Sequence, residues 1–186
     1  MTIPNVITVI RLFLVPLVVL MMVQGRMQAA FVLFLIAGIS DAVDGAIARR
    51  FKMKSELGAY LDPLADKALI VSIYVTLGIT GVIPSWLTIL VVARDIMIIS
   101  AVMISWIMDK PVEIAPIIVS KLNTVVQIAY VLAVVAGAAW RGMPGALVTT
   151  MGAACFITTV VSGLDYVISY SRLALRARDR PRAGPA

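Results

Sequence analysis

The sequence has little charge, no histidine and a single cysteine. Of its 186 residues, 14% are Asp, Glu, Lys or Arg and 61% are hydrophobic. Cys155 has no second cysteine to pair with, which excludes an intrachain disulfide. The mean hydropathy of +1.02 is far above that of a soluble domain and indicates a polytopic membrane protein. Neither the alternation typical of strands nor a repeat of fixed period is visible, so we expect an all-α fold.

Six apolar segments are long enough to cross the hydrocarbon core of a bilayer, which takes about 20 residues of helix. They cover roughly residues 6–23, 28–49, 59–80, 85–107, 118–139 and 146–171. We therefore predict one domain of six transmembrane helices over residues 1–171. Residues 172–186 are rich in Arg and Pro, and we predict a basic, disordered tail there.

The net charge of +6 could indicate a nucleic-acid partner, but the cations lie at the ends of the apolar segments. Membrane topology and anionic lipids explain that placement, so we expect no nucleic acid. One side of the predicted bundle has only Arg26 and Arg141. The cations of the other side are Arg49, Arg50, Lys52, Lys54, Lys110, Lys121, Arg172, Arg176, Arg178, Arg180 and Arg182. This asymmetry predicts cytoplasmic termini in an integral protein of the bacterial inner membrane.

Four of the ten acidic residues form two pairs at the predicted cytoplasmic ends of the second and third spans. Asp41 and Asp44 share one helix face, as do Asp62 and Asp66, because their spacing is three and four residues. Two carboxylates 4 Å apart repel by about 4 kcal/mol at an effective dielectric near 20. Such a cluster therefore needs cations or bound protons. Oxygen ligands and the absence of histidine favour Mg²⁺ or Mn²⁺ over zinc.

Further ionisable residues lie within or at the edge of apolar spans, where they usually face a polar cavity. They are Arg11, Arg94, Asp95 and Lys121. Neighbours in a helix point about 100° apart, so Arg94 and Asp95 need not pair with each other. Metal-bound carboxylates beside such cations suit the handling of phosphate groups. Gly45 and Ala48 leave room for a bulky ligand, although plain helix packing explains small residues equally well.

The stretch Asp41-x2-Asp44-Gly45-x2-Ala48-Arg49-x8-Gly58-x3-Asp62-x3-Asp66 resembles the complete signature of the CDP-alcohol phosphatidyltransferases. The resemblance implies transfer of a phosphatidyl group from CDP-diacylglycerol to an alcohol acceptor, with release of CMP. It also implies two Mg²⁺ or Mn²⁺ ions in each active site and a homodimer among membrane lipids.

The resemblance also implies roles for individual residues. All four aspartates would bind metal, and Asp66 would also be the catalytic base that takes the proton of the acceptor hydroxyl. The residues expected to bind the CDP-diacylglycerol donor are Asn5, Thr8, Arg11, Gly45, Ala48, Arg49, Ser55 and Gly58.

Other stretches bear on the acceptor alcohol. The stretches 3–11, 61–67, 93–95 and 120–127 resemble the eukaryotic-type cardiolipin synthases within this family, although the loop before Ser120 is shorter. This likeness predicts phosphatidylglycerol as acceptor, bound by Arg94, Lys121 and Asn123.

Two alternatives stay open. Within the same family, the acceptor could be glycerol 3-phosphate, giving phosphatidylglycerophosphate. That soluble dianion favours additional cations, and the sequence has few, which favours the lipid. A cation transporter would place acidic residues near the middle of the bilayer. Here the aspartates lie at span ends beside Arg49, which disfavours a transporter. A non-catalytic scaffold would have no use for four aspartates.

Overall fold

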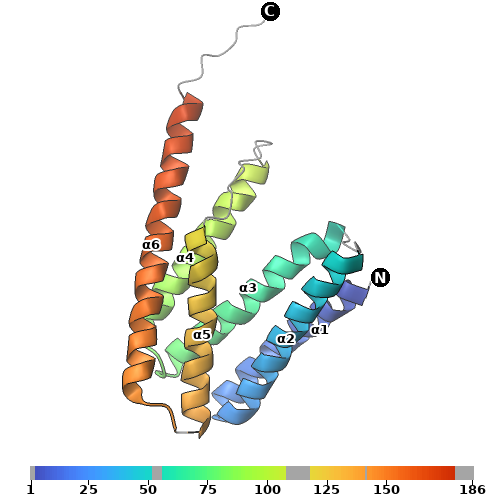
Figure 1. Ribbon diagram of the computed structural model, residues 1–186, viewed down its shortest axis with the longest axis vertical. Coiled ribbons are helices and arrows are strands. Elements are labelled where there is room, and N and C mark those ends of the chain that lie inside the picture. The colour runs from blue at the N-terminus through green and yellow to red at the C-terminus, as the bar shows by residue number, and fades with distance from the viewer. Residues whose placement is uncertain (1–2, 52–55, 108–117, 141, 179–186) are drawn as a thin grey trace, which may run out of the picture.

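The computed structural model describes the backbone of residues 3–51, 56–107, 118–140 and 142–178. Side chains are described for residues 9–41, 43, 65, 67–100, 119–140 and 142–168. This part of the chain contains helices and no strand, which confirms the all-α prediction (Figure 1). The six helices are α1 (Ile3–Val23), α2 (Met27–Phe51), α3 (Glu56–Ile79), α4 (Ser85–Ile107), α5 (Ile118–Trp140) and α6 (Gly145–Arg178).

The helices run up and down, and their packing order differs from their chain order. α1 packs on α2 and α3, α2 packs on α5, α5 packs on α6, and α4 packs on both α3 and α6. α3 and α5 also touch. The turns after α1, α3 and α5 lie at one end of the bundle, at the bottom of Figure 1. The start of α1, the end of α2 and the start of α3 lie together at the opposite end.

Glycines in the left-handed conformation end two of the helices. Gly25 has a φ of 73° after α1, and the amide of Arg26 donates to the carbonyl of Met21 at 2.9 Å. Gly81 has a φ of 72° after α3. A side chain strains this backbone conformation, whereas glycine adopts it freely. These two turns reverse the chain and set α2 beside α1 and α4 beside α3.

Tyr74 stands at the centre of the bundle and is fully buried. Its hydroxyl donates to the backbone carbonyl of Gln127 at 3.1 Å and lies 3.4 Å from the sulfur of Cys155. The contacts join α3 to α5 and α6. Cys155 is therefore a buried thiol, in keeping with its position in an apolar run of the sequence.

Large apolar side chains cover much of the outer surface, as expected of a membrane protein. Phe13, Ile79 and Ile89 are 73%, 82% and 68% exposed. Two helical stretches of the described residues are long and apolar enough to cross a membrane, Val119–Trp140 and Gly145–Ile168. Shorter apolar stretches are Val9–Val23, Met27–Asp41 and Lys67–Ile79. Six complete spans stay a prediction.

The end of α6 corrects one expectation. The helix continues to Arg178, so residues 172–178 are helical and not part of a disordered tail. Leu, Ala and Arg fill most of this segment and are among the strongest helix formers. Residues 179–186 lie outside the described part of the chain.

Candidate active site

Arg11 and Asp41 meet at the contact between α1 and α2. The guanidinium Nη1 of Arg11 lies 2.8 Å from Oδ1 of Asp41. Arg11 is only 2% exposed, whereas the Asp41 side chain is 42% exposed. A buried guanidinium is costly unless it is paired, so this contact fixes both side chains. A residue expected to bind the donor is thus the direct neighbour of a predicted metal ligand.

The remaining signature residues have described backbones but not described side chains. Asp44, Gly45, Ala48 and Arg49 are on α2, and Gly58, Asp62 and Asp66 are on α3. Asn5 and Thr8 are on α1, and Ser55 lies outside the described residues altogether. The aspartates lie about two to three turns from the end of α2 and the start of α3, and these two helix termini are at the same end of the bundle (Figure 1). Of the four predicted metal ligands, only Asp41 has a described side chain. The described side chains contain no group of three or more potential metal ligands.

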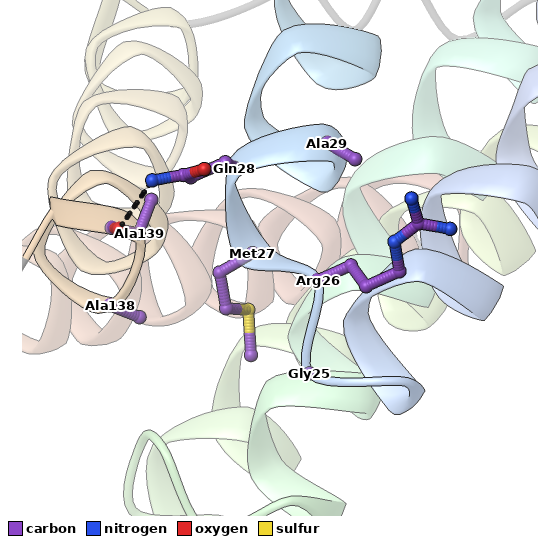
Figure 2. Close-up of a pocket in the computed structure, with 7 residues that line it drawn as sticks. All are labelled: Gly25, Arg26, Met27, Gln28, Ala29, Ala138 and Ala139. Carbon is purple, nitrogen blue, oxygen red and sulfur yellow. Dashed lines mark hydrogen bonds between the residues drawn. The ribbon is translucent and has the colours of Figure 1, made fainter.

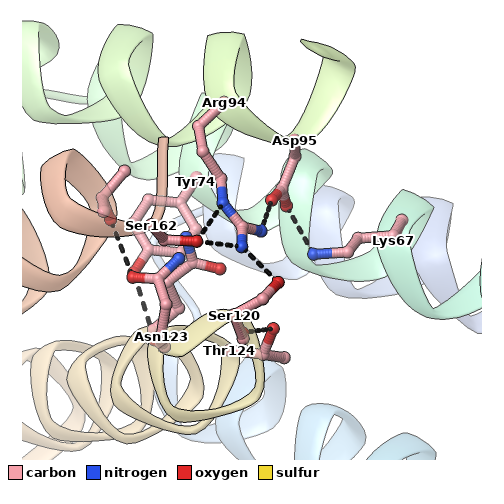
Figure 3. Close-up of polar contacts among 10 residues, drawn as sticks. Lys67, Tyr74, Arg94, Asp95, Ser120, Asn123, Thr124 and Ser162 are labelled. Carbon is pink, nitrogen blue, oxygen red and sulfur yellow. Dashed lines mark hydrogen bonds and ion pairs between the residues drawn. The ribbon is translucent and has the colours of Figure 1, made fainter. Parts of the chain in front are cut away.

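Asp95 of α4 is completely buried and holds two cations (Figure 3). Its Oδ1 accepts from Nη1 of Arg94 at 2.7 Å, and its Oδ2 accepts from Nζ of Lys67 at 2.8 Å. Arg94 and Asp95 do pair, although they are neighbours in the helix. The long arginine side chain folds back far enough to reach the carboxylate. Asp95 thereby links α4 to α3.

The other donors of Arg94 extend this network to two more helices. Its Nε donates to the hydroxyl of Ser162 in α6 at 3.2 Å, and its Nη2 donates to the hydroxyl of Ser120 in α5 at 2.6 Å. Arg94 is 5% exposed. A buried guanidinium needs hydrogen-bond acceptors for its N–H groups, and the two serine hydroxyls are such acceptors. Arg94 therefore ties together α4, α5 and α6, and an anion could bond to it only by displacing a hydroxyl or using a spare donor.

The two other residues expected at the acceptor lie in different surroundings. The side chain of Lys121 is exposed on α5, whereas Asn123 is fully buried. Oδ1 of Asn123 accepts from the hydroxyls of Thr158 and Thr159 at 2.9 and 3.0 Å. Its Nδ2 has no hydrogen-bond partner within the described part of the protein. The three predicted residues therefore do not form one open cleft.

Three members of the Arg94 network had no role in the sequence interpretation. Lys67 had a usable signal, because it directly follows Asp66 and lies at the start of an apolar run. Ser120 begins one of the stretches that resemble the cardiolipin synthases but received no role of its own, and Ser162 gave no signal, because serines are common in membrane helices.

A surface pocket of about 300 Å³ lies at the other end of the bundle (Figure 2). It is lined by Gly25 and Arg26 of the turn after α1, by residues 27–29 at the start of α2, and by Ala138 and Ala139 of α5. The Nε2 of Gln28 donates to the carbonyl of Ala139 there at 3.3 Å. A second, mostly apolar groove of about 450 Å³ runs between α3 and α4. The pocket at the turn is remote from the aspartates, so we do not assign it to the active site.

Comparison with known proteins agrees with the signature. The family model of CDP-alcohol phosphatidyltransferase matches residues 1–174. The probable cardiolipin synthase (CMP-forming) of Drosophila melanogaster is 31% identical over 91% of this chain and 58% of its own length. The cardiolipin synthase (CMP-forming) of Rattus norvegicus is 32% identical over 89% of this chain and 60% of its own length.

A bacterial protein is similar over more of its length. The probable phosphatidylglycerophosphate synthase of Mycobacterium tuberculosis is 33% identical over 88% of this chain and 78% of its own length. The chain spans only about three fifths of the length of the two cardiolipin synthases. The family match, in contrast, covers nearly the whole sequence and includes all four aspartates. The chain belongs to the CDP-alcohol phosphatidyltransferase family.

Proposed function

We propose that the chain transfers the phosphatidyl group of CDP-diacylglycerol to phosphatidylglycerol, forming cardiolipin and CMP. The observation that carries this proposal is the similarity to two proteins named cardiolipin synthase (CMP-forming), which extends over 89% or more of the chain. The complete signature supports the donor half of the reaction.

Four carboxylates without a histidine suit hard divalent cations, and we assign Asp41, Asp44, Asp62 and Asp66 to two ions of Mg²⁺ or Mn²⁺. The one described carboxylate supports this assignment, because Asp41 is 42% exposed and open to a ligand. Bound divalent ions would neutralise the pyrophosphate of the donor and the charge on departing CMP. Arg11 would hold Asp41 in the orientation that binding requires.

The residues around the aspartates would bind the donor nucleotide. Gly45 and Ala48 have small side chains, so cytidine can lie close to the backbone of α2. Arg49 would pair with the phosphates of the nucleotide. Asn5 and Thr8, on the first turns of α1, would complete the donor site beside Arg11.

The chemical step would be a displacement at the phosphorus that carries the diacylglycerol. The glycerol hydroxyl of the acceptor attacks this phosphorus, its proton passes to the carboxylate of Asp66, and the bond to CMP breaks. Arg94, Lys121 and Asn123 would contact the acceptor at separate points, since they do not share one open cleft. Two donors on α5 support this proposal: the amide nitrogen of Asn123, which has no hydrogen-bond partner among the described residues, and the exposed ammonium of Lys121.

A direct assay tests this reaction. The purified full-length protein is supplied with CDP-diacylglycerol, Mg²⁺ or Mn²⁺, and labelled phosphatidylglycerol. We expect labelled cardiolipin and one CMP for each cardiolipin formed. Absence of CMP with every alcohol offered would refute phosphatidyl transfer by this chain.

The second candidate is synthesis of phosphatidylglycerophosphate from glycerol 3-phosphate. It is favoured by the similarity to the Mycobacterium tuberculosis protein, which this chain covers to 78% of its length. The same assay with labelled glycerol 3-phosphate distinguishes the two. A product from glycerol 3-phosphate alone would establish the second candidate in place of the first.

We further infer a single domain of six spans, embedded in the bacterial inner membrane, with both termini on the cytoplasmic side. The shared position of the α1 start and the two aspartate-bearing helix ends supports this topology. A homodimer is also proposed, on the basis of the resemblance to the family.

A further inference from the structure

We infer that the interior of the bundle has a binding site for a water molecule between Asn123 and Gln127 of α5. Both side chains are completely buried, and they are four residues apart in the helix. Residues at this spacing share one helix face, with their Cβ atoms about 6 Å apart. One water can bridge such a gap through two hydrogen bonds of ordinary length.

The protein itself leaves these two amide groups incompletely bonded. Oδ1 of Asn123 accepts from the hydroxyls of Thr158 and Thr159, whereas its Nδ2 has no partner among the described residues. For Gln127, neither Nε2 nor Oε1 has a partner there. Folded proteins leave few buried polar atoms unpaired, because each unpaired atom costs the desolvation of its group. Three such atoms on one helix face therefore point to a polar ligand.

Water fits these atoms because it both donates and accepts hydrogen bonds. It can accept from Nδ2 of Asn123 and donate to Oε1 of Gln127. Both side chains are 0% exposed, which leaves no opening for a larger molecule, and lipid chains offer no hydrogen bonds. The amide nitrogen of Asn123 carries two N–H groups. A water on one of them leaves the other for the acceptor proposed above.

The surroundings of the two amides are polar on three helices. The hydroxyl of Tyr74 in α3 donates to the backbone carbonyl of Gln127 at 3.1 Å, and the sulfur of Cys155 in α6 lies 3.4 Å from that hydroxyl. The hydroxyl of Thr159, one turn further along α6, donates to Asn123 at 3.0 Å. Buried waters in proteins occupy such places, where they have two to four polar partners.

X-ray radiolysis of the full-length protein in detergent tests the site directly. Radiolysis forms hydroxyl radicals where water is bound, so a side chain without solvent exposure is oxidised only beside an internal water. Tyr74 and Cys155 are 0% exposed and lie next to the two amides. We expect both to be oxidised much faster than Met22, an oxidisable residue that is 2% exposed in the apolar core. Protection of Tyr74 and Cys155 to the level of Met22 would overturn the inference.

A Gln127→Met variant supplies a second test. Methionine has about the same length but no amide, so the water loses one of its partners. We expect oxidation of Tyr74 and Cys155 to fall toward that of Met22, and the thermal midpoint to drop. Removal of an unpaired amide would instead relieve its desolvation cost, so an unchanged or higher midpoint would contradict the water site. Gln24→Met, at an exposed glutamine, should leave both readouts unchanged.

Neither readout depends on turnover, so the water site is tested separately from the proposed phosphatidyl transfer. Should Gln127→Met not fold, the oxidation rates of Tyr74, Cys155 and Met22 in the unaltered protein still decide whether the interior holds water.

Discussion

Arg11 of α1 orients Asp41 of α2 through a contact of 2.8 Å between Nη1 and Oδ1. The guanidinium is buried and the carboxylate is partly open, so the pair lies where the packed interior meets the surface. A signature carboxylate is thus positioned by a residue from a different helix. The signature alone does not describe the site, because α1 lies outside it.

Replacement of Arg11 by Met should lower turnover by at least about tenfold, because Asp41 loses its orientation. The free energy of unfolding should fall by about 1–3 kcal/mol, less than for a fully buried pair, because solvent can still reach Asp41. CMP release and the thermal midpoint in detergent measure the two effects. Arg11→Lys retains the charge, so its turnover and its thermal midpoint should lie between those of the unaltered protein and those of Arg11→Met. Full activity of Arg11→Met would contradict a positioning role.

Asp66→Asn should abolish turnover while the protein still folds. Loss of a general base typically costs a factor of about 10²–10⁴, and the same change removes a proposed metal ligand. The matched control is Asp165→Asn on α6, an aspartate outside the cluster, which should retain most of the activity. Cardiolipin formation and elution in size exclusion are measured for both variants. An active Asp66→Asn protein would exclude Asp66 as the base.

Gly78→Ala should destabilise the contact between α3 and α4. A Cβ at Gly78 would collide with the hydroxyl of Thr88, which itself donates to the carbonyl of Tyr74 at 3.2 Å. Overpacking of this kind typically costs about 1–3 kcal/mol. Gly38→Ala is the matched control, since a Cβ there would meet no atom within 4 Å. Thermal midpoints of the two variants should differ clearly, and equal midpoints would argue against the close approach.

Ser162→Ala should weaken the junction of α4 and α6, because Arg94 loses the oxygen that accepts from its Nε at 3.2 Å. Hydrogen bonds to charged groups contribute about 1.5–3 kcal/mol each. Thr150→Ala removes an exposed hydroxyl that bonds within its own helix, and its effect should stay within about 0.5 kcal/mol. Unfolding in denaturant measures both. Similar losses for the two variants would show that Arg94 does not depend on Ser162.

Cysteine labelling can test the proposed topology. In a Cys155→Ala background, Val82→Cys places a thiol in the turn after α3, and Lys52→Cys places one in the link between α2 and α3. We expect an impermeant maleimide to label Val82→Cys in cells with a permeable outer membrane and Lys52→Cys only after lysis. Labelling in the reverse pattern would place the termini on the outer side.

The helices were predictable because polar or turn-forming residues interrupt the apolar segments. The α3–α4 turn, with Gly81 and Pro84, lies between two predicted segments, and the helices end close to it. The end of α6 was missed because its arginines resemble a soluble tail in composition, although they also favour a helix. Composition therefore located the helices but not the point where helix formation stops.

Sequence spacing predicts which helices carry the candidate site residues, and their roles stay a prediction. The aspartate spacing placed two pairs on helix ends, and the depth of Arg94 and Asp95 in an apolar span indicated a polar interior. The pairing of Asp95 with Lys67 depends on the packing of α3 against α4. The order in which helices pack cannot be read from a single sequence. The burial of Asn123 has the same origin, since α5 packs on three other helices.

The packing order has an evolutionary consequence. The signature aspartates lie on α2 and α3, beside α1, whereas Arg94, Ser120 and Ser162 come from α4, α5 and α6. With the roles proposed above, the donor and metal residues lie on α1 to α3, and the proposed acceptor-binding residues lie on α4 and α5. New alcohol specificities can then arise by change in the second half while the first is inherited intact. Chimaeras of related enzymes, joined at the turn after α3, would carry the acceptor of their carboxyl-terminal parent.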